Sequence, residues 1–136
     1  MRKLNGMMFA VLVCSCSLLA QEVQELPAND PIKLIEVLAT GKTVTFPGPI
    51  KGYVKEAHLD KVLLLSQGRE NIAGHVELTA NSQLNVQGST LENEGLYLIL
   101  GFLRGSYPPG LSSLRMTDEE KRMVQAFIRG YALRGD

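Results

Sequence analysis

Both cysteines of this 136-residue chain, Cys14 and Cys16, lie in its first twenty residues. Basic residues at Arg2 and Lys3 precede a short apolar run that ends in small residues, which is the layout of an export signal. The run is shorter than the roughly 20 apolar residues that a transmembrane helix needs. We therefore predict that residues 1–20 are an export signal. At most one cysteine then survives processing, so the mature domain forms no internal disulfide and its stability has to come from packing.

The residues around Cys16 predict how the exported chain is held. Val13, Cys14 and Ser15 resemble the lipobox of bacterial lipoproteins, in which a small residue follows two positions after an aliphatic one. Cleavage before Cys16 would give it a lipid anchor, and each methylene buried in the membrane contributes about 0.8 kcal/mol. The alternative is a secreted product cut after Ala20. We expect an exported protein, in the periplasm or held at the outer membrane by lipid alone.

The chain after the signal is close to neutral. Removal of Arg2 and Lys3 takes the 14 basic residues down to 12, against 14 acidic ones. This balance gives no electrostatic reason to expect a nucleic-acid partner or direct binding to an anionic membrane surface. A chain of about 120 residues forms one domain with one modest core. We therefore interpret residues 21–29 as a polar spacer and residues 30–136 as a single domain.

Local signals near position 30 predict a helix followed by two strands. Asp30 suits the N-cap, Pro31 suits the first helical position, and Gly41 can adopt the left-handed conformation that ends a helix. Residues 42–46 and 50–54 then alternate between apolar and polar side chains, and a turn with two prolines separates them. The pattern predicts an N-terminal helix and two short strands.

The order of these elements resembles a known family. The helix, Thr40-Gly41-Lys42, a strand, a proline turn and then Ile50-Lys51-Gly52-Tyr53-Val54 are similar to the N-terminal periplasmic domain of secretins and its relative in TonB-dependent receptors. The likeness is local, with its specific part at 32–54. It implies that Gly41, Lys42 and Gly52 form a structural motif in which Gly41 closes the helix and Gly52 admits another backbone. It also implies a partner, a larger envelope protein such as a secretin or another secretion-channel subunit.

Three later segments complete the expected sheet. Residues 59–66 fit either a helix or a buried strand, and the resemblance favours the helix. Residues 74–79 and 84–86 are typical of the two arms of a hairpin. Residues 95–103 are continuously apolar, which predicts the longest strand, buried on both faces.

The end of the chain predicts an amphipathic helix. Thr117-Asp118-Glu119-Glu120 is a capping box, and the acidic residues favour the positive end of the helix dipole. The apolar stripe that follows consists of Met123, Val124, Phe127, Ile128 and Tyr131. Its side chains either cover the sheet of their own domain, which we favour, or form a docking face for a partner at Met123, Phe127, Ile128 and Tyr131.

A different architecture can be drawn from two related segments. Ile50-Lys51-Gly52-Tyr53-Val54 recurs as Ile72-Ala73-Gly74-His75-Val76, and 73–95 resembles the repeats of filamentous-haemagglutinin adhesins, which form β-helices. This alternative predicts a β-solenoid and a surface adhesin or ligand-binding module. Stacked repeats need at least three units, however, and the flanking helices do not belong in such a coil.

The chain offers few side chains for chemistry. His58 and His75 are its only histidines and have no metal-ligand spacing around them, so we predict structural, hydrogen-bonded roles. Glu92 and Glu94 flank Asn93 in what we interpret as an exposed turn. No serine sits in a nucleophile elbow, and no haem-attachment motif is present. We expect no catalytic residue, no metal and no cofactor.

These observations together predict a fold and a class of function. The fold is α+β, with an N-terminal helix, a small mixed β-sheet and a covering C-terminal helix. The resemblance to the secretin domain implies the function, that of a non-enzymatic accessory or assembly component of a bacterial envelope secretion, pilus or conjugation system, acting through protein contacts. Besides the adhesin, a small periplasmic inhibitor or immunity protein remains an alternative, because such a protein needs only a shaped surface.

Overall fold

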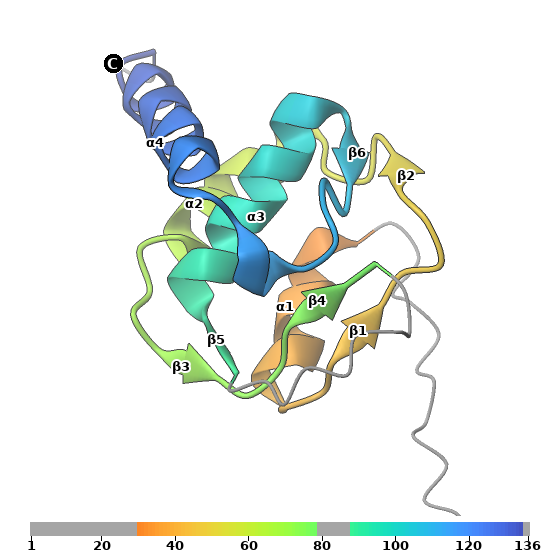
Figure 1. The fold of residues 1–136 in the computed structure, drawn as a ribbon. Coiled ribbons are helices and arrows are strands. Elements are labelled where there is room, and N and C mark those ends of the chain that lie inside the picture. Colours follow the sequence, from red (N-terminus) through yellow and green to blue (C-terminus); the bar gives the residue numbers. More distant parts are fainter. Residues whose placement is uncertain (1–29, 79–87, 135–136) are drawn as a thin grey trace, which may run out of the picture.

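The computed structural model describes residues 30–78 and 88–134, and its centre is a single helix with the other elements packed around it (Figure 1). In chain order the elements are α1 (Pro31–Ala39), β1 (Val44–Thr45), β2 (Ile50–Lys51), the 3-10 turn η1 (Glu56–His58), α2 (Leu59–Leu65), β3 (Asn71–Ile72), β4 (Val76–Glu77), β5 (Ser89–Thr90), α3 (Leu91–Arg104), β6 (Ser106–Tyr107), the 3-10 turn η2 (Ser113–Arg115) and α4 (Asp118–Ala132). The fold is mixed α+β, as predicted. The leader, Cys16, the spacer 21–29 and the hairpin arm 84–86 lie outside the described residues.

The central element, α3, corrects the sequence prediction. Residues 95–103 were expected to form a strand, but they lie in a 14-residue helix in which Glu94–Gly101 are all buried. Thr90 Oγ1 caps the start by accepting from the backbone N–H of Asn93 at 3.0 Å, and Gly105 ends the helix with φ +72°. An unbroken run of apolar residues indicates that a segment is buried on all sides. Such a run does not distinguish a fully buried helix from a fully buried strand.

Two glycines allow neighbouring elements to approach α3 closely. A Cβ at Gly95 would lie 2.7 Å from the backbone nitrogen of Ser66, which follows α2, and one at Gly101 would lie 2.7 Å from Cδ2 of Tyr107 on β6. Real Cβ atoms do not approach other atoms so closely, and both contacts involve groups fixed by packing. The lack of side chains at these two positions therefore sets how tightly α2 and β6 pack on the central helix.

The predicted N-terminal helix is confirmed as α1. Asp30 Oδ1 accepts from the backbone N–H of Ile32 at 3.0 Å and of Lys33 at 3.3 Å, and Pro31 occupies the first helical position. Leu34 and Leu38 are fully buried on its inner face. The helix buries one apolar stripe against the core, as the capping and spacing signals require.

Gly41, Lys42 and Gly52, which the resemblance implies to be a structural motif, have simple structural roles. Gly41 follows α1 with φ +91°, which agrees with its predicted role in closing the helix. Lys42 is exposed just before β1. Gly52 was expected to make room for another backbone, but a Cβ there would meet open space; its φ of +63° is what favours glycine.

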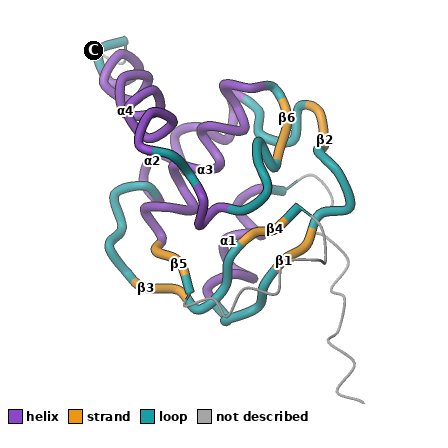
Figure 2. The backbone as a smooth tube through the Cα atoms, in the orientation of Figure 1, coloured by secondary structure: helices purple, strands orange, loops and turns teal. Residues whose placement is uncertain are grey.

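Within residues 30–78 and 88–134 the strands form three separate pairs and not one sheet. β1 pairs with β4 in parallel through Val44 and Val76, whereas β2 pairs with β6 and β3 with β5 in antiparallel fashion. Each strand has two residues; short loops join β1 to β2 and β3 to β4, whereas α2 lies between β2 and β3 and α3 between β5 and β6 (Figure 2). β4 lies in the described part of the predicted hairpin arm 74–79. Its strand partner is β1. The two similar segments, 50–54 and 72–76, pair with different elements and do not stack, so the β-solenoid alternative is wrong.

Residues 59–66 form a helix, as the resemblance favoured. In α2 the side chains of Leu59 and Val62 are buried against the core, and Leu64 points outward with 69% of its surface exposed. Helix spacing explains this division, because a run of adjacent leucines around a short helix cannot all face the same side.

A group of four aromatic rings fills the core beside α3. Tyr53 and Tyr107 stack at 5.2 Å between centroids, Phe46 meets both edge-on, and Tyr97 meets Tyr107 edge-on at 5.6 Å. Pairs in these geometries contribute roughly 0.5–1.5 kcal/mol beyond their buried area. This packing holds β2 and β6 against the central helix.

Candidate functional site

Buried polar side chains gather where α3 begins. Ser113 Oγ donates to Glu94 Oε1 at 2.6 Å, and it accepts from the backbone N–H of Val76 at 3.1 Å. Asn93 Nδ2 donates to Ser89 Oγ at 3.0 Å and to the carbonyl oxygen of Ser113 at 2.8 Å. We call the side chains of Ser89, Asn93, Glu94 and Ser113 the Glu94 cluster. It joins α3, β4, β5 and η2.

Glu94 is the most unusual residue of the cluster. Its exposed fraction is 0%, and its Oε2 has no hydrogen-bond partner among the described residues. Burial raises the pKa of this carboxyl to about 7, against the opposing effect of hydrogen bonds from Ser113 and Ser89. The prediction of an exposed turn at Glu92 and Glu94 is therefore wrong for Glu94. Asn93 and Gly95, which suggested a turn, lie in the first turn of the buried helix.

The two histidines take the structural roles predicted for them. His75 Nε2 donates to Glu77 Oε1 at 2.6 Å, and His75 Nδ1 lies 3.2 Å from Thr43 Oγ1. His58 Nδ1 accepts from the backbone N–H of Lys55 at 3.0 Å, at the start of η1. In the part of the chain that the structure describes, no three histidine, cysteine or acidic side chains gather as a metal site.

The Glu94 cluster does not present a nucleophile to substrate in this conformation. Ser113 is fully buried, and its hydroxyl is used by the Glu94 carboxyl and the Val76 amide. A serine nucleophile needs a base within hydrogen-bond reach and access to the reacting carbonyl. The cluster therefore connects elements of the fold. Its hydrogen bonds mainly join η2 to α3.

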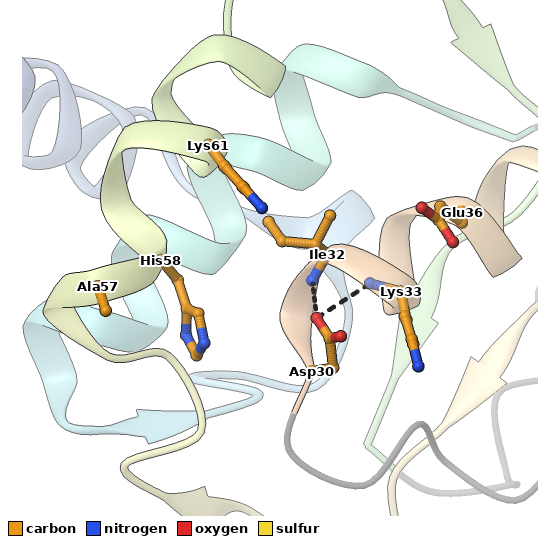
Figure 3. Close-up of a pocket in the computed structure, with 7 residues that line it drawn as sticks. All are labelled: Asp30, Ile32, Lys33, Glu36, Ala57, His58 and Lys61. Carbon is orange, nitrogen blue, oxygen red and sulfur yellow. Dashed lines mark hydrogen bonds between the residues drawn. The ribbon is translucent and has the colours of Figure 1, made fainter.

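An open groove of about 460 Å³ lies between α1 and the start of α2 (Figure 3). It is lined by Asp30, Ile32, Lys33, Glu36, Ala57, His58 and Lys61. Figure 3 shows Asp30 turned to the α1 backbone that it caps, with the charged side chains of Lys33, Glu36 and Lys61 spread around the opening. Basic and acidic groups alternate and do not converge, so the groove defines no single class of ligand. Of these residues, the sequence predicted Asp30 as a helix cap and His58 as a structural histidine, and it predicted no groove.

The apolar stripe of α4 is divided by the structure. Val124 is buried, and Phe127, Ile128 and Tyr131 are partly buried: Phe127 packs on Phe102 of α3 at 5.9 Å, and Tyr131 Oη donates to Asp60 Oδ1 of α2 at 3.1 Å. Met123 stays 43% exposed. The helix covers α3 and α2, and the expectation that it covers a sheet is wrong, because no strand pair lies beneath it.

Figure 1 shows α4 leaving the body of the molecule, with the C-terminal end of the chain at its far end. Leu133, which follows the helix, is 79% exposed. Met123, in the second turn of α4, and Leu133, just after its end, are therefore the large apolar side chains of this segment that the domain leaves exposed.

Comparisons with known proteins were made for the whole chain. No family model matches it, and no match was found among curated proteins or solved structures. None of the helices in the described ranges is both long and apolar enough to cross a bilayer.

Proposed function

We propose that this protein is an exported, non-enzymatic accessory component of a bacterial envelope secretion, pilus or conjugation assembly. Its partner is a larger envelope protein, a secretin or another secretion-channel subunit, and it acts by protein contacts. The local resemblance at 32–54 supplies this class of partner. The Glu94 cluster is hydrogen-bonded within the fold through Ser113, Asn93 and Glu94 Oε1, and the proposal assigns it no catalytic role and requires no cofactor.

The observation that carries the proposal is the projection of α4 from the body of the domain. A helix that only covered its own core would bury its whole apolar stripe, whereas Met123 is 43% and Leu133 is 79% exposed here. Phe127, Ile128 and Tyr131 give the helix a rigid base on α3 and α2. The docking face in this proposal is therefore the exposed apolar surface of this segment, formed by Met123 at the edge of the stripe and Leu133 after the end of the helix.

Affinity capture from the native envelope tests the proposal. The full chain, tagged at its C-terminus, is isolated after mild crosslinking, and the captured proteins are identified by mass spectrometry. We expect a secretin or another ring subunit of a secretion or pilus assembly. Capture of a toxin or hydrolase alone would favour the inhibitor alternative, and the absence of any channel subunit would contradict the assembly role.

Two variants of α4 distinguish its outer face from the rest of the helix. Met123→Glu places a charge on the proposed docking face and is expected to lower the captured amount about tenfold or more, as interface hot spots of about 1.4 kcal/mol do. Gln125→Glu adds the same charge to an exposed position on another face of α4 and should leave capture unchanged. Equal capture by both variants would remove α4 from the interface.

The anchor is tested separately. Cys16→Ala should move the protein from the membrane fraction to the soluble periplasmic fraction if acylation at this residue holds it. Unchanged fractionation would contradict lipidation at Cys16 and favour cleavage after Ala20.

A further inference from the structure

The η2 turn, which precedes α4, is held to the central helix by side chains from the first turn of α3. Ser113 in η2 reaches Glu94 with its hydroxyl, and its carbonyl oxygen accepts from Asn93. The two other residues of this three-residue turn use their backbone N–H groups locally, Leu114 to Ser112 Oγ and Arg115 to Ser112 O. The contact of η2 with α3 therefore depends on the first turn of α3.

The Glu94 carboxyl has no positive partner in this site. The groups that face it are Ser113 from η2, Ser89 from β5, Tyr107 from β6 and Tyr97 one turn along α3. With these neutral neighbours, the protonated carboxyl can be buried in the protein. The ionised carboxylate has no opposite charge nearby to compensate for its loss of solvation.

The charged residues of the neighbouring elements are engaged with one another. His75, just before β4, and Glu77 of β4 form a buried hydrogen-bonded pair at 2.6 Å. Beyond β6, Arg104 at the end of α3 pairs with Glu120 of α4 at 2.7 Å. α2 meets this end of α3 with the uncharged Ser66 against Gly95. Within the described ranges, no lysine or arginine is hydrogen-bonded to the Glu94 carboxyl.

We propose that Glu94 is a proton-controlled latch, whose neutral carboxyl holds η2 against α3 and whose ionisation releases that turn. The direction follows from the burial. The bonds from Ser113 and Ser89 favour the ionised form, but loss of solvation outweighs them and raises the pKa to about 7. The proton therefore leaves near neutral pH, where the opening of η2 becomes sensitive to the acidity around the protein.

Amide hydrogen exchange, measured by NMR on the soluble chain, tests the latch at single residues. The backbone N–H of Val76 reports on it directly, because it donates to Ser113 Oγ, and those of Leu114 and Arg115 report on η2 itself. If the carboxyl regains its ordinary pKa when η2 opens, the opening equilibrium should increase about tenfold between about pH 6 and about pH 8. The core amides of Leu98 and Leu100 exchange only through global unfolding, and they should stay more strongly protected than these three amides at both pH values.

Variants make the test specific to Glu94. Glu94→Gln keeps a neutral side chain of the same shape and should abolish the pH dependence of exchange at Val76, Leu114 and Arg115. Glu92→Gln, at an exposed position of the same turn, should retain it. A persistent tenfold change after Glu94→Gln would overturn the latch. Protection of Val76, Leu114 and Arg115 equal to that of the core amides at both pH values would overturn it too, because these amides would then exchange only through global unfolding.

A measurement on the wild-type chain covers the case in which Glu94→Gln does not fold. The carboxyl carbon of Glu94 is followed by NMR as the pH is raised. Titration near neutral pH, with simultaneous changes at Val76 and Leu114, supports the latch. Titration at the ordinary pH of a solvated glutamate, near pH 4.5, would overturn it. The latch is independent of the proposed partner, because both measurements use the isolated protein.

Discussion

Arg104 at the end of α3 reaches Glu120 in the first turn of α4, with 2.7 Å between Nη2 and Oε1. The same arginine donates through Nη1 to the carbonyl oxygen of Pro109 at 3.0 Å. Glu120 Oε2 in turn accepts from the backbone N–H of Thr117 at 2.9 Å and closes the capping box. One corner of the fold therefore fixes the start of α4, and the direction of the projecting helix is set there.

Loss of the cap at this corner should loosen α4. In Thr117→Ala the backbone N–H of Glu120 loses its acceptor, Thr117 Oγ1, so the free energy of unfolding should fall by about 1 kcal/mol. Urea denaturation followed by circular dichroism measures the change. Thr117→Ser keeps the hydroxyl and is the control; if it destabilises the protein as much as the alanine variant does, the cap is not the cause.

The stability of the whole domain should fall as the pH rises through neutrality. The pKa of Glu94 is raised from 4.5 to about 7, so the folded state holds a proton that the unfolded state has already lost. The free energy of unfolding is then highest below about pH 4.5 and decreases up to about pH 7, by at most about 3 kcal/mol from this group.

Urea denaturation at a series of pH values measures this dependence. Glu94→Gln should flatten the curve in that window, whereas Glu92→Gln should leave its slope as in the wild type. A wild-type stability that increases from about pH 5 to about pH 7 would have the wrong sign for a buried neutral carboxyl.

Two glycine-to-alanine substitutions should have opposite effects. Gly95→Ala places a Cβ 2.7 Å from the backbone nitrogen of Ser66, so α2 has to move and we expect a loss of about 1–3 kcal/mol. Gly130→Ala in α4 meets open space and replaces glycine in a helix interior, which should stabilise the protein by up to about 1 kcal/mol. Thermal and urea unfolding of both variants give the comparison. A neutral Gly95→Ala would show that α2 does not pack closely on α3.

Two buried tyrosine hydroxyls differ in their partners and should differ in their contribution to stability. Tyr97 Oη donates to the carbonyl oxygen of Gly110 at 2.9 Å, so Tyr97→Phe should cost about 1 kcal/mol. The hydroxyl of Tyr107 is buried with no partner among the described residues, so Tyr107→Phe should be neutral or stabilising. Equilibrium unfolding measures both. A larger loss for Tyr107→Phe than for Tyr97→Phe would reverse the order expected from these contacts.

The helix ends that carry strong local signals could be predicted from the sequence. Asp30 and Pro31 specify the start of α1, and Thr117 with Glu120 specifies the start of α4, because capping depends on residues within one turn. The strands near 44 and 50 were also predicted. Their partners were not, because Val76 and Tyr107 are distant in sequence and no short-range pattern encodes the pairing.

The main error, α3, had local signals that continuous apolarity obscured. Thr90 is a good N-cap, Glu92 and Glu94 suit the first turn, and Gly105 suits the C-terminal end. Helix spacing would also have placed Glu94 on the same face as Leu98 and Gly101, which are buried. The burial of Glu94 could therefore be inferred only after the segment was recognised as a helix. Which residues of α4 stay exposed depends on how far the rest of the domain extends beneath the helix. No local sequence pattern indicates that extent.

The antiparallel pairing of β2 with β6 has a consequence for how the chain acquires its structure during synthesis. Ile50 has Tyr107 as its partner, so the first half of the protein leaves the ribosome with that strand and Tyr53 still lacking the ring against which they pack. A nascent chain that ends after α2 should accordingly remain open to protease, and protection should arise only once the segment carrying Tyr107 has emerged.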